Sequence, residues 1–499
     1  MPPVDQPAPS YDELAALVAT LTGALKVVRD ELAESRRQAA DAVEALTAAT
    51  AQIAELRARL EKNSKNSSKP PSGDGLAKPE PRSRREKTGR PAGGQPGHPG
   101  STLALVADPD RLLPHEPECC RRCGDALLLA QVVGFERRQV VDVAFPAGRM
   151  VVEHRLLERE CAGCGARTRA AAPDGVDAPV QYGEQVRALV LYLYGGQFLS
   201  KDRTVQAMAE LFGIHLSTGT VVAMQARATA TLEKEFLPLL RDLLRQADVL
   251  GADETGLRVE GKQHWVHCAR TDKLTLVTVH PRRGRAGIAA ADVLGGFTGT
   301  LVHDCWASYD IFLSADHQLC CAHVARELVA VAERYDPRAW CWATQALEAL
   351  VDLQKLAADA RFAGHRAVKA ADSAEARHRL RSAVQAGISQ TQGRTSSLMR
   401  DENNLAQRLA TREADYLRFL SDVAIPADNN GSERDIRMVK LRQKISGCLR
   451  SLAGARHFCA LRSYLSTARK HGLGMLDALA RLTAGRPWLP ENTPTLTTA

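Results

Sequence analysis

The segment between Leu14 and Leu60 repeats apolar residues at every seventh position. One series consists of Val18, Leu25, Leu32, Ala39, Leu46, Ile53 and Leu60. Its companion consists of Leu14, Leu21, Val28, Ser35, Ala42, Ala49 and Leu56. A seven-residue period of this length is typical of a coiled coil, because it keeps one apolar seam facing a partner helix. We predict a self-associating coiled coil over residues 14–62, after a disordered segment at 1–13. The alternative is a lone helix folded onto the body.

The length of the chain predicts several domains, because 499 residues exceed what one ordinary core holds. A hydrophobic fraction of 44% and a charged fraction of 25% are those of a soluble globular protein. The N-terminus has neither the basic start nor the apolar stretch of a secretory signal. No run approaches the roughly 18 apolar residues that a membrane span needs. We therefore expect a cytoplasmic protein with no membrane partner.

Positive charge is concentrated in two stretches. Residues 57–100 hold eleven Lys or Arg against four Asp or Glu, and residues 434–470 hold ten against one. Such stretches suit a polyanion, whose phosphates they neutralise; the alternative is a pair of solvated charge runs. Residues 63–110 are rich in Pro, Gly and Arg, which predicts a basic flexible arm. Arg90 in its GRP sequence is similar to arginines that enter the minor groove of DNA.

Four of the twelve cysteines form two CxxC pairs within residues 111–179. They are Cys120, Cys123, Cys161 and Cys164, and the residues between the pairs alternate as strands do. Two thiolate pairs on hairpin turns can complete a tetrahedral zinc site with no open position. The sequence therefore predicts a zinc ribbon with one structural Zn²⁺. Cys119 is either an unpaired neighbour or an alternative ligand.

Residues 180–240 have a helical pattern. An apolar-periodic helix is followed by a turn at Gly213 and by a second helix that Ser217 can cap. Helix, glycine-containing turn and helix is the layout of a helix-turn-helix DNA reader. Simple packing of small helices is the alternative.

A strand pattern begins near residue 245. Three strands, the first ending in Asp253, precede a helix from about Gly287 to Leu294 and a fourth strand ending in Asp304. This order over residues 245–335 is that of a ribonuclease-H-like core, in which the first and fourth strands are neighbours. A third carboxylate, Glu433, falls in the first turns of a helix that Asp428 or Asn429 can cap.

Three carboxylates on strand, strand and helix suit two-metal cleavage of a phosphodiester. Carboxylate oxygens are the ligands that Mg²⁺ prefers, and two such ions activate the nucleophile and stabilise the leaving oxygen. We expect two Mg²⁺ or Mn²⁺ ions at Asp253, Asp304 and Glu433. A helical insertion is predicted at residues 336–420, completion of the core at 421–485, and a disordered tail at 486–499.

Basic side chains near Glu433 are candidate DNA contacts. Those that recur at helical spacing after it are Arg434, Arg437, Lys440 and Lys444. His323 and Arg326 open a helix that follows a short strand, and His323 is placed to hold a phosphate. The alternative for His323 is a residue at a helix N-terminus with a local hydrogen bond.

Several motifs occur in the order known from one protein family. They are GGQPGHPG, the paired CxxC, ADET, HDCWASYD, CAHVAREL and IPADNNGSERDIRMVKLRQKISGCLRS. From Lys62 to about Gly485 the chain resembles the transposases of insertion-sequence family sixty-six. Two departures are Gly256, where relatives usually have proline, and Cys305-Trp306, which replaces a Gly-aromatic pair.

The resemblance implies a ribonuclease-H-like nuclease whose aspartate–aspartate–glutamate triad is Asp253, Asp304 and Glu433. It implies double-stranded DNA as partner, both the terminal inverted repeats of a bacterial element and a target, and in many relatives two small accessory proteins. We therefore expect a multidomain α/β DNA transposase associated with the nucleoid. The alternatives are a structure-specific nuclease without strand transfer and an inactive DNA-binding relative acting as repressor or scaffold.

Overall fold

A computed structural model describes most of the chain. The described residues are 10–63, 66, 107–108, 158–160, 167–169, 178, 181–336, 338–393 and 396–491. The chain divides into one unit of residues 1–78, 180–201 and 218–499 and a second unit of residues 79–179 and 202–217. In these described ranges, no helix has the length and apolarity that crossing a bilayer requires.

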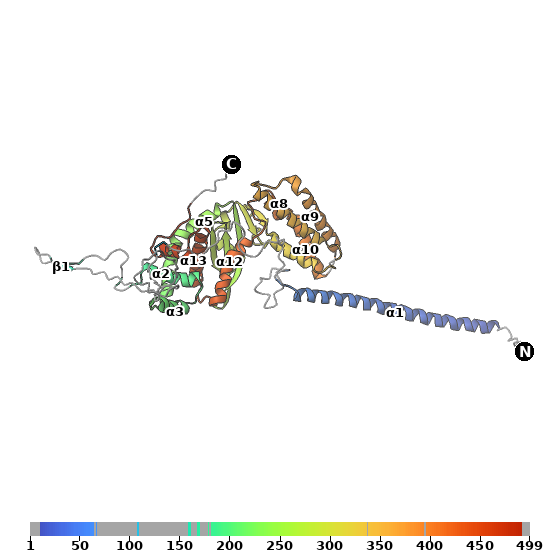
Figure 1. The fold of residues 1–499 in the computed structure, drawn as a ribbon. Helices are drawn as coiled ribbons and strands as arrows, with labels where there is room; N and C mark the ends of the chain where they lie inside the picture. The colour runs from blue at the N-terminus through green and yellow to red at the C-terminus, as the bar shows by residue number, and fades with distance from the viewer. Residues whose placement is uncertain are drawn as a thin grey trace, which may run out of the picture. The chain divides into compact units, whose positions relative to one another are not determined.

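Helix α1 (Tyr11–Leu60) is one continuous helix of 50 residues (Figure 1). It begins three residues before Leu14, because Ser10 and Glu13 form a reciprocal capping box that satisfies the first backbone donors. The large apolar side chains of the seven-residue repeat are exposed along it; Leu25, for example, is 60% exposed. The predicted long helix is present, and the partner for its seam remains a prediction.

The second unit is described only in part. Strands β1 (Glu158–Glu160) and β2 (Arg167–Arg169) pair antiparallel, with the second CxxC between them. All four predicted zinc ligands and Arg90 lie outside the described residues. Helix α3 (Lys201–Phe212) ends at Gly213, whose φ of +62° suits glycine at a helix C-terminus.

The first unit contains a five-stranded sheet. Its strands are β3 (Val249–Val259), β4 (Lys262–Arg270), β5 (Thr275–His280), β6 (Thr300–His303) and β7 (Asp316–Leu319). They lie in the order β5-β4-β3-β6-β7, and only β4 runs antiparallel to its neighbours. Strands β3 and β6 pair directly, as the sequence predicts for the first and fourth strands. The carboxyl ends of β3, β5, β6 and β7 therefore share one edge, here called the carboxyl edge.

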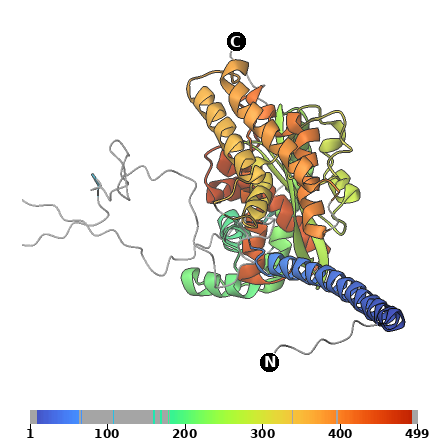
Figure 2. The same cartoon turned by 90° about the vertical axis from the view of Figure 1, so that its right-hand side faces the viewer.

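Helices surround this sheet on both faces (Figures 1 and 2). Before the sheet come α2 (Glu184–Leu191), η2 (Tyr192–Gly196), α4 (Thr218–Thr231), η3 (Leu232–Phe236) and α5 (Leu237–Arg245). Between strands lie α6 (Arg285–Ala290) and η4 (Leu294–Gly296), and α7 (Cys321–Ala332) follows β7. The core is completed by α12 (Asn430–Ser446), α13 (Leu452–Lys470) and α14 (Met475–Thr483).

Alternation along β3 decides which helix covers which face. Leu257 and Val259 pack with Ile436 and Val439, so α12 lies on the face of the odd-numbered β3 residues. Leu250 and Ala252 pack with α5 and the middle of α13 on the other face. Helix α13 also covers the sheet edge, because its hydroxyls accept the Thr275 and Val277 backbone N–H groups.

The predicted insertion consists of helices. They are α8 (Trp342–Phe362), α9 (Ala370–Thr391), α10 (Ser397–Thr411), α11 (Glu413–Tyr416) and η5 (Arg418–Leu420). Figure 1 shows α8, α9 and α10 side by side, and α8 also contacts α7. The buried Glu402 carboxylate joins these helices by accepting from Trp342 Nε1 and Tyr335 OH, both at 2.7 Å.

The first part of the predicted disordered tail is ordered. Residues up to Glu491 are described, and Trp488 donates its backbone N–H to Tyr464 OH. The Trp488 ring also contacts His471, and the side chain packs against the main core. The prediction of disorder was wrong for 486–491, because a large aromatic side chain anchors this segment.

Candidate active site

Three predicted carboxylates come from three elements of the first unit. Asp253 is on β3, Asp304 directly follows β6, and Glu433 lies in the first turn of α12. Burial raises the pKa of Asp253 well above its usual value, as do the neighbouring charges of Glu254, Asp304 and Glu433. The structure therefore gathers these carboxylates near the carboxyl edge. Repulsion within such a cluster is relieved by hard divalent cations, so the donor set fits Mg²⁺ or Mn²⁺.

The turn after β6 fixes Asp304. Its Oδ1 accepts the Trp306 backbone N–H at 3.1 Å, and the Cys305 N–H donates to His303 Nδ1 at 3.2 Å. Cys305 has a φ of +70°, a left-handed conformation that glycine adopts without steric cost. This conformation explains the glycine of the Gly-aromatic pair that Cys305-Trp306 replaces.

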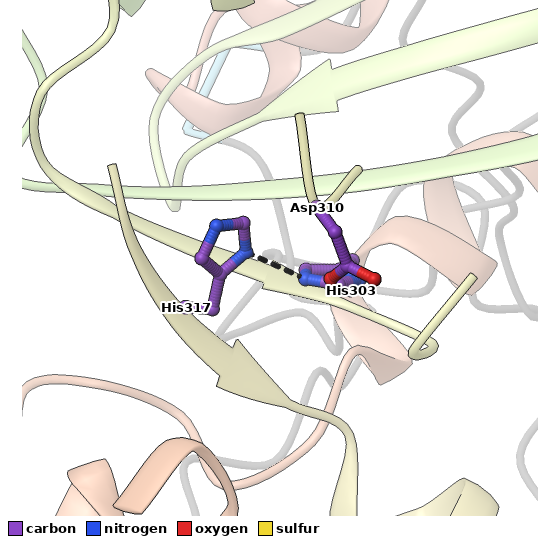
Figure 3. A group of neighbouring side chains, drawn as sticks. All are labelled: His303, Asp310 and His317. Atoms are coloured by element: carbon purple, nitrogen blue, oxygen red, sulfur yellow. Dashed lines mark hydrogen bonds between the residues drawn. The ribbon is translucent and has the colours of Figure 1, made fainter. Parts of the chain in front are cut away.

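A histidine pair that the sequence did not reveal lies behind this turn. His303 Nε2 is 2.9 Å from His317 Nδ1, with Asp310 beside them (Figure 3). Burial, and then the charges of His317 and Arg412, lower the pKa of His303 to about 3. Because His303 Nδ1 accepts the Cys305 N–H, the ring proton of neutral His303 is on Nε2. The Nε2–H group therefore donates a hydrogen bond to His317 Nδ1. The cluster has the composition of a metal site, but the lone pair that a metal needs is absent in this tautomer.

The first turn of α12 lies directly on β3. A Cβ atom on Gly251 would be 2.6 Å from Ser432 Oγ and 3.1 Å from Asn429 Oδ1. Asn429 occupies the N-cap position, yet its side chain makes no cap hydrogen bond. Instead its Nδ2 donates to the Ala252 carbonyl at 2.7 Å. Of the two predicted caps, Asp428 accepts the backbone N–H of Asn430, the first residue of α12, at 2.9 Å. The Asn429 amide does not cap the helix, because it bonds to β3 and so holds the start of α12 on the strand.

A second anchor fixes the rotation of α12. The Asp435 carboxylate accepts from Lys470 Nζ at 2.7 Å and from Thr275 Oγ1 at 2.9 Å. The Arg270 side chain also packs against Gly431, where a Cβ atom would be 2.4 Å from Nη1. These contacts to β4, β5 and α13 leave Glu433 on the partly exposed side of the helix.

His323 and Arg326 of α7 lie beside Glu433. His323 Nε2 is 3.7 Å and Arg326 Nη2 is 3.6 Å from Glu433 Oε1. Burial and the Arg326 charge lower the pKa of His323, while Asp304 and Glu433 oppose that shift. Within the described part of the chain, His323 Nδ1 and Arg326 Nε are buried without a hydrogen-bond partner. The local hydrogen bond that was the alternative interpretation of His323 is therefore not seen at Nδ1.

Comparison with known proteins decides the family. A model of the transposase IS66 family matches residues 179–457, more than half of the chain. The chain belongs to the IS66 transposase family. A model of a family of unknown function, DUF6444, matches residues 1–104. "Uncharacterized protein y4qI" of Sinorhizobium fredii is 26% identical over 408 residues, 74% of this chain and 72% of that protein.

This transposase family member has a row of exposed cations after Glu433. Arg434, Arg437, Lys440 and Lys444 are all exposed on α12. At about 100° per residue, the last three share one side of the helix with Glu433. Burial and the Lys444 charge lower the pKa of Lys440. By contrast, Arg442 and Arg462 are buried, so part of the basic stretch is structural.

Proposed function

We propose that this IS66 family member is a DNA transposase whose Asp253, Asp304 and Glu433 hold two Mg²⁺ or Mn²⁺ ions. The observation that carries the proposal is the cluster of mutually repelling carboxylates near the carboxyl edge. The strand order, with the first and fourth strands paired, is typical of ribonuclease-H-like nucleases. When bound, such ions activate the attacking water or 3′-hydroxyl and stabilise the leaving oxygen.

The protein's own groups hold the DNA around these carboxylates. His323 and Arg326 have buried nitrogen atoms without partners, which suits contact with a phosphate oxygen. Arg437, Lys440 and Lys444 follow Glu433 on one side of α12 and neutralise the adjoining backbone. The chain therefore positions a phosphodiester between α7 and α12.

The proposed substrate is the terminal inverted repeat of an insertion sequence, joined after cleavage to target DNA. The helical segment at residues 180–240, with its turn at Gly213, is the proposed helix-turn-helix-like reader of that repeat. Small accessory proteins encoded by the same element are proposed partners.

The function is tested with a labelled DNA duplex that carries the terminal inverted repeat. Its cleavage, and its joining to target DNA, are measured in Mg²⁺. Asp253→Asn, Asp304→Asn and Glu433→Gln should each abolish cleavage while end binding persists. The exposed Asp352→Asn is the matched control and should behave as wild type. Cleavage without joining would favour the structure-specific nuclease. Wild-type binding without metal-dependent nicking would favour the inactive repressor or scaffold.

One structural Zn²⁺ at Cys120, Cys123, Cys161 and Cys164 belongs to the same proposal. Protein purified without chelator should contain one zinc per chain, and Cys120→Ser with Cys123→Ser should remove it. Cys448→Ser changes an exposed free thiol and is the control. No zinc in the wild-type protein would contradict the site.

The exposed seam of α1 supports self-association through a coiled coil. Its apolar side chains are exposed within the described single chain, and burying them against a second α1 is favourable. Deleting residues 1–62 should preserve binding to one end but lower the sedimentation coefficient and abolish concerted cleavage of two ends. A deletion protein that sediments as the same oligomer would place the dimer contact elsewhere.

A further inference from the structure

Arg283, just after β5, is held between two tryptophan rings and a buried carboxylate. Its guanidinium carbon is 4.2 Å from the Trp306 ring centroid and 5.0 Å from that of Trp265. Nε and Nη2 donate to Glu254 Oε1 at 2.9 and 2.5 Å. The Glu254 side chain is 1% exposed and also accepts from Tyr309 OH at 2.8 Å.

This arrangement lies on the opposite face of the sheet from α12. Glu254 is paired across the ladder with His267, and Trp265 with Gly256 and His280. These side chains share the even-numbered face of β3, whereas Asp253 points to the α12 face. Arg283 stacks on Trp306, two residues after Asp304, and pairs with Glu254, the residue that follows Asp253. Arg283 therefore lies close to Asp253 and Asp304, on the face of the sheet opposite to α12.

Only two of the three guanidinium nitrogen atoms of Arg283 donate hydrogen bonds to Glu254. The third nitrogen, Nη1, makes no hydrogen bond to any of the described residues, and the side chain is 40% exposed. The stacked rings and the carboxylate fix the remaining donors in one direction. A guanidinium held in this way loses little conformational entropy when it binds an oxyanion.

The loop that carries Arg283 is fixed and positively charged. The Arg282 backbone N–H donates to His280 Nδ1 at 3.1 Å, and the Arg282 carbonyl lies 3.4 Å from His267 Nε2. Arg282 and Arg285 are both exposed. Three arginines within four residues repel cations, so this loop suits an anionic ligand.

We propose that Arg283, flanked by Arg282 and Arg285, binds a backbone phosphate of DNA beside the cleaved bond. This inference rests on the proposed function, which supplies DNA as the anion. It adds a second contact surface: α12 holds the duplex on one face of the sheet, and the 282–285 loop holds it on the other.

The test is the salt dependence of DNA binding by the full-length Glu254→Gln/Arg283→Gln variant. Removing both charges leaves no unpaired buried carboxylate and keeps the net charge of the chain. Anisotropy is measured between 0.05 and 0.3 M KCl, with Ca²⁺ replacing Mg²⁺, on two 40-base-pair duplexes. One duplex carries the element's terminal repeat and the other has random sequence.

The expected result is a slope of log Kd against log salt that is shallower by about 1 on both duplexes. If the contact acts by charge alone, affinity at 0.15 M KCl should fall about fivefold. Asp352→Asn with Arg379→Gln removes another ion pair at no change in net charge and should keep the wild-type slope.

An unchanged slope for Glu254→Gln/Arg283→Gln overturns the inference. If that variant does not fold, Arg282→Gln/Arg285→Gln decides, because it changes only exposed side chains; its slope must also become shallower. Failure of the wild-type protein to prefer the terminal duplex contradicts the proposed end recognition instead. That result is distinguishable, because the phosphate contact is measured on random DNA as well.

Discussion

Replacing Gly251 with alanine tests how α12 brings Glu433 to Asp253. The new Cβ would be 2.6 Å from Ser432 Oγ and 3.1 Å from Asn429 Oδ1, both closer than ordinary contact. The first turn of α12 must then move by about half an ångström or more, or the buried hydrogen bond from the Ser432 hydroxyl to Asn429 Oδ1 must break. Overpacking costs about 1–3 kcal/mol, and a lost buried hydrogen bond costs a similar amount. We expect the free energy of unfolding to fall by about 2 kcal/mol.

Urea unfolding followed by tryptophan fluorescence measures this loss, because all five tryptophans lie between residues 265 and 488. Cleavage should fall by up to about a hundredfold, since a catalytic group displaced by about 1 Å can lose that much. End binding should be unchanged. Adding Ser432→Ala removes the nearest atom and should recover at least half of the lost stability.

Gly256→Ala is the matched control on the same strand. The three atoms nearest to its new Cβ all belong to the end of Gln263, an exposed and flexible side chain. We expect a change of no more than about 0.5 kcal/mol. The reasoning is refuted if Gly251→Ala and Gly256→Ala have the same stability and the same cleavage rate.

Three other substitutions test separate parts of the structure. Cys305→Gly relieves a left-handed φ, so it should raise the free energy of unfolding by up to about 1 kcal/mol and keep cleavage. If urea unfolding shows that this free energy falls by about 1 kcal/mol instead, Cys305 is not strained. Burial lowers the pKa of His267 to about 4, so its stabilising contribution is present above the unfolded pKa of about 6.5 and is lost as pH falls toward 4. Between pH 7.5 and 5.5 the wild-type protein should lose about 1.3 kcal/mol more than His267→Gln in urea unfolding, and equal losses contradict the shift. Glu402→Leu leaves Trp342 Nε1 and other buried donors without an acceptor and should cost about 3 kcal/mol; unchanged thermal unfolding contradicts that network.

The sequence predicts the main elements of the core because their signals are local. The apolar run before Asp304 marks the end of β6, whereas the strand that was predicted to end in Asp253 continues to Val259. The proximity of the two aspartates follows from the strand order, which the observed β3–β6 pair confirms. The helix that begins near Glu433 is likewise marked by polar residues ahead of an apolar period.

The remaining features depend on contacts between distant segments. Gly251 and Ser432 are 181 positions apart, so no local pattern shows that glycine is needed for their approach. The His303–His317 pair and the Arg283–Glu254 pair likewise require the sheet register. Asn429 has the sequence signature of a helix cap, and only the neighbouring strand diverts its side chain. The sequence around each of these residues therefore does not reveal the contacts that the folded core gives them.

Manganese binding measured by electron paramagnetic resonance tests most directly whether the three carboxylates hold divalent ions. The full-length wild-type protein and its Asp253→Asn, Asp304→Asn and Glu433→Gln variants are titrated with Mn²⁺, with Asp352→Asn as the control. Each of the three variants should need at least about tenfold more Mn²⁺ for half-saturation, because the removed charge is a metal ligand. The control should match the wild type. Wild-type affinity in all three variants would contradict the metal site.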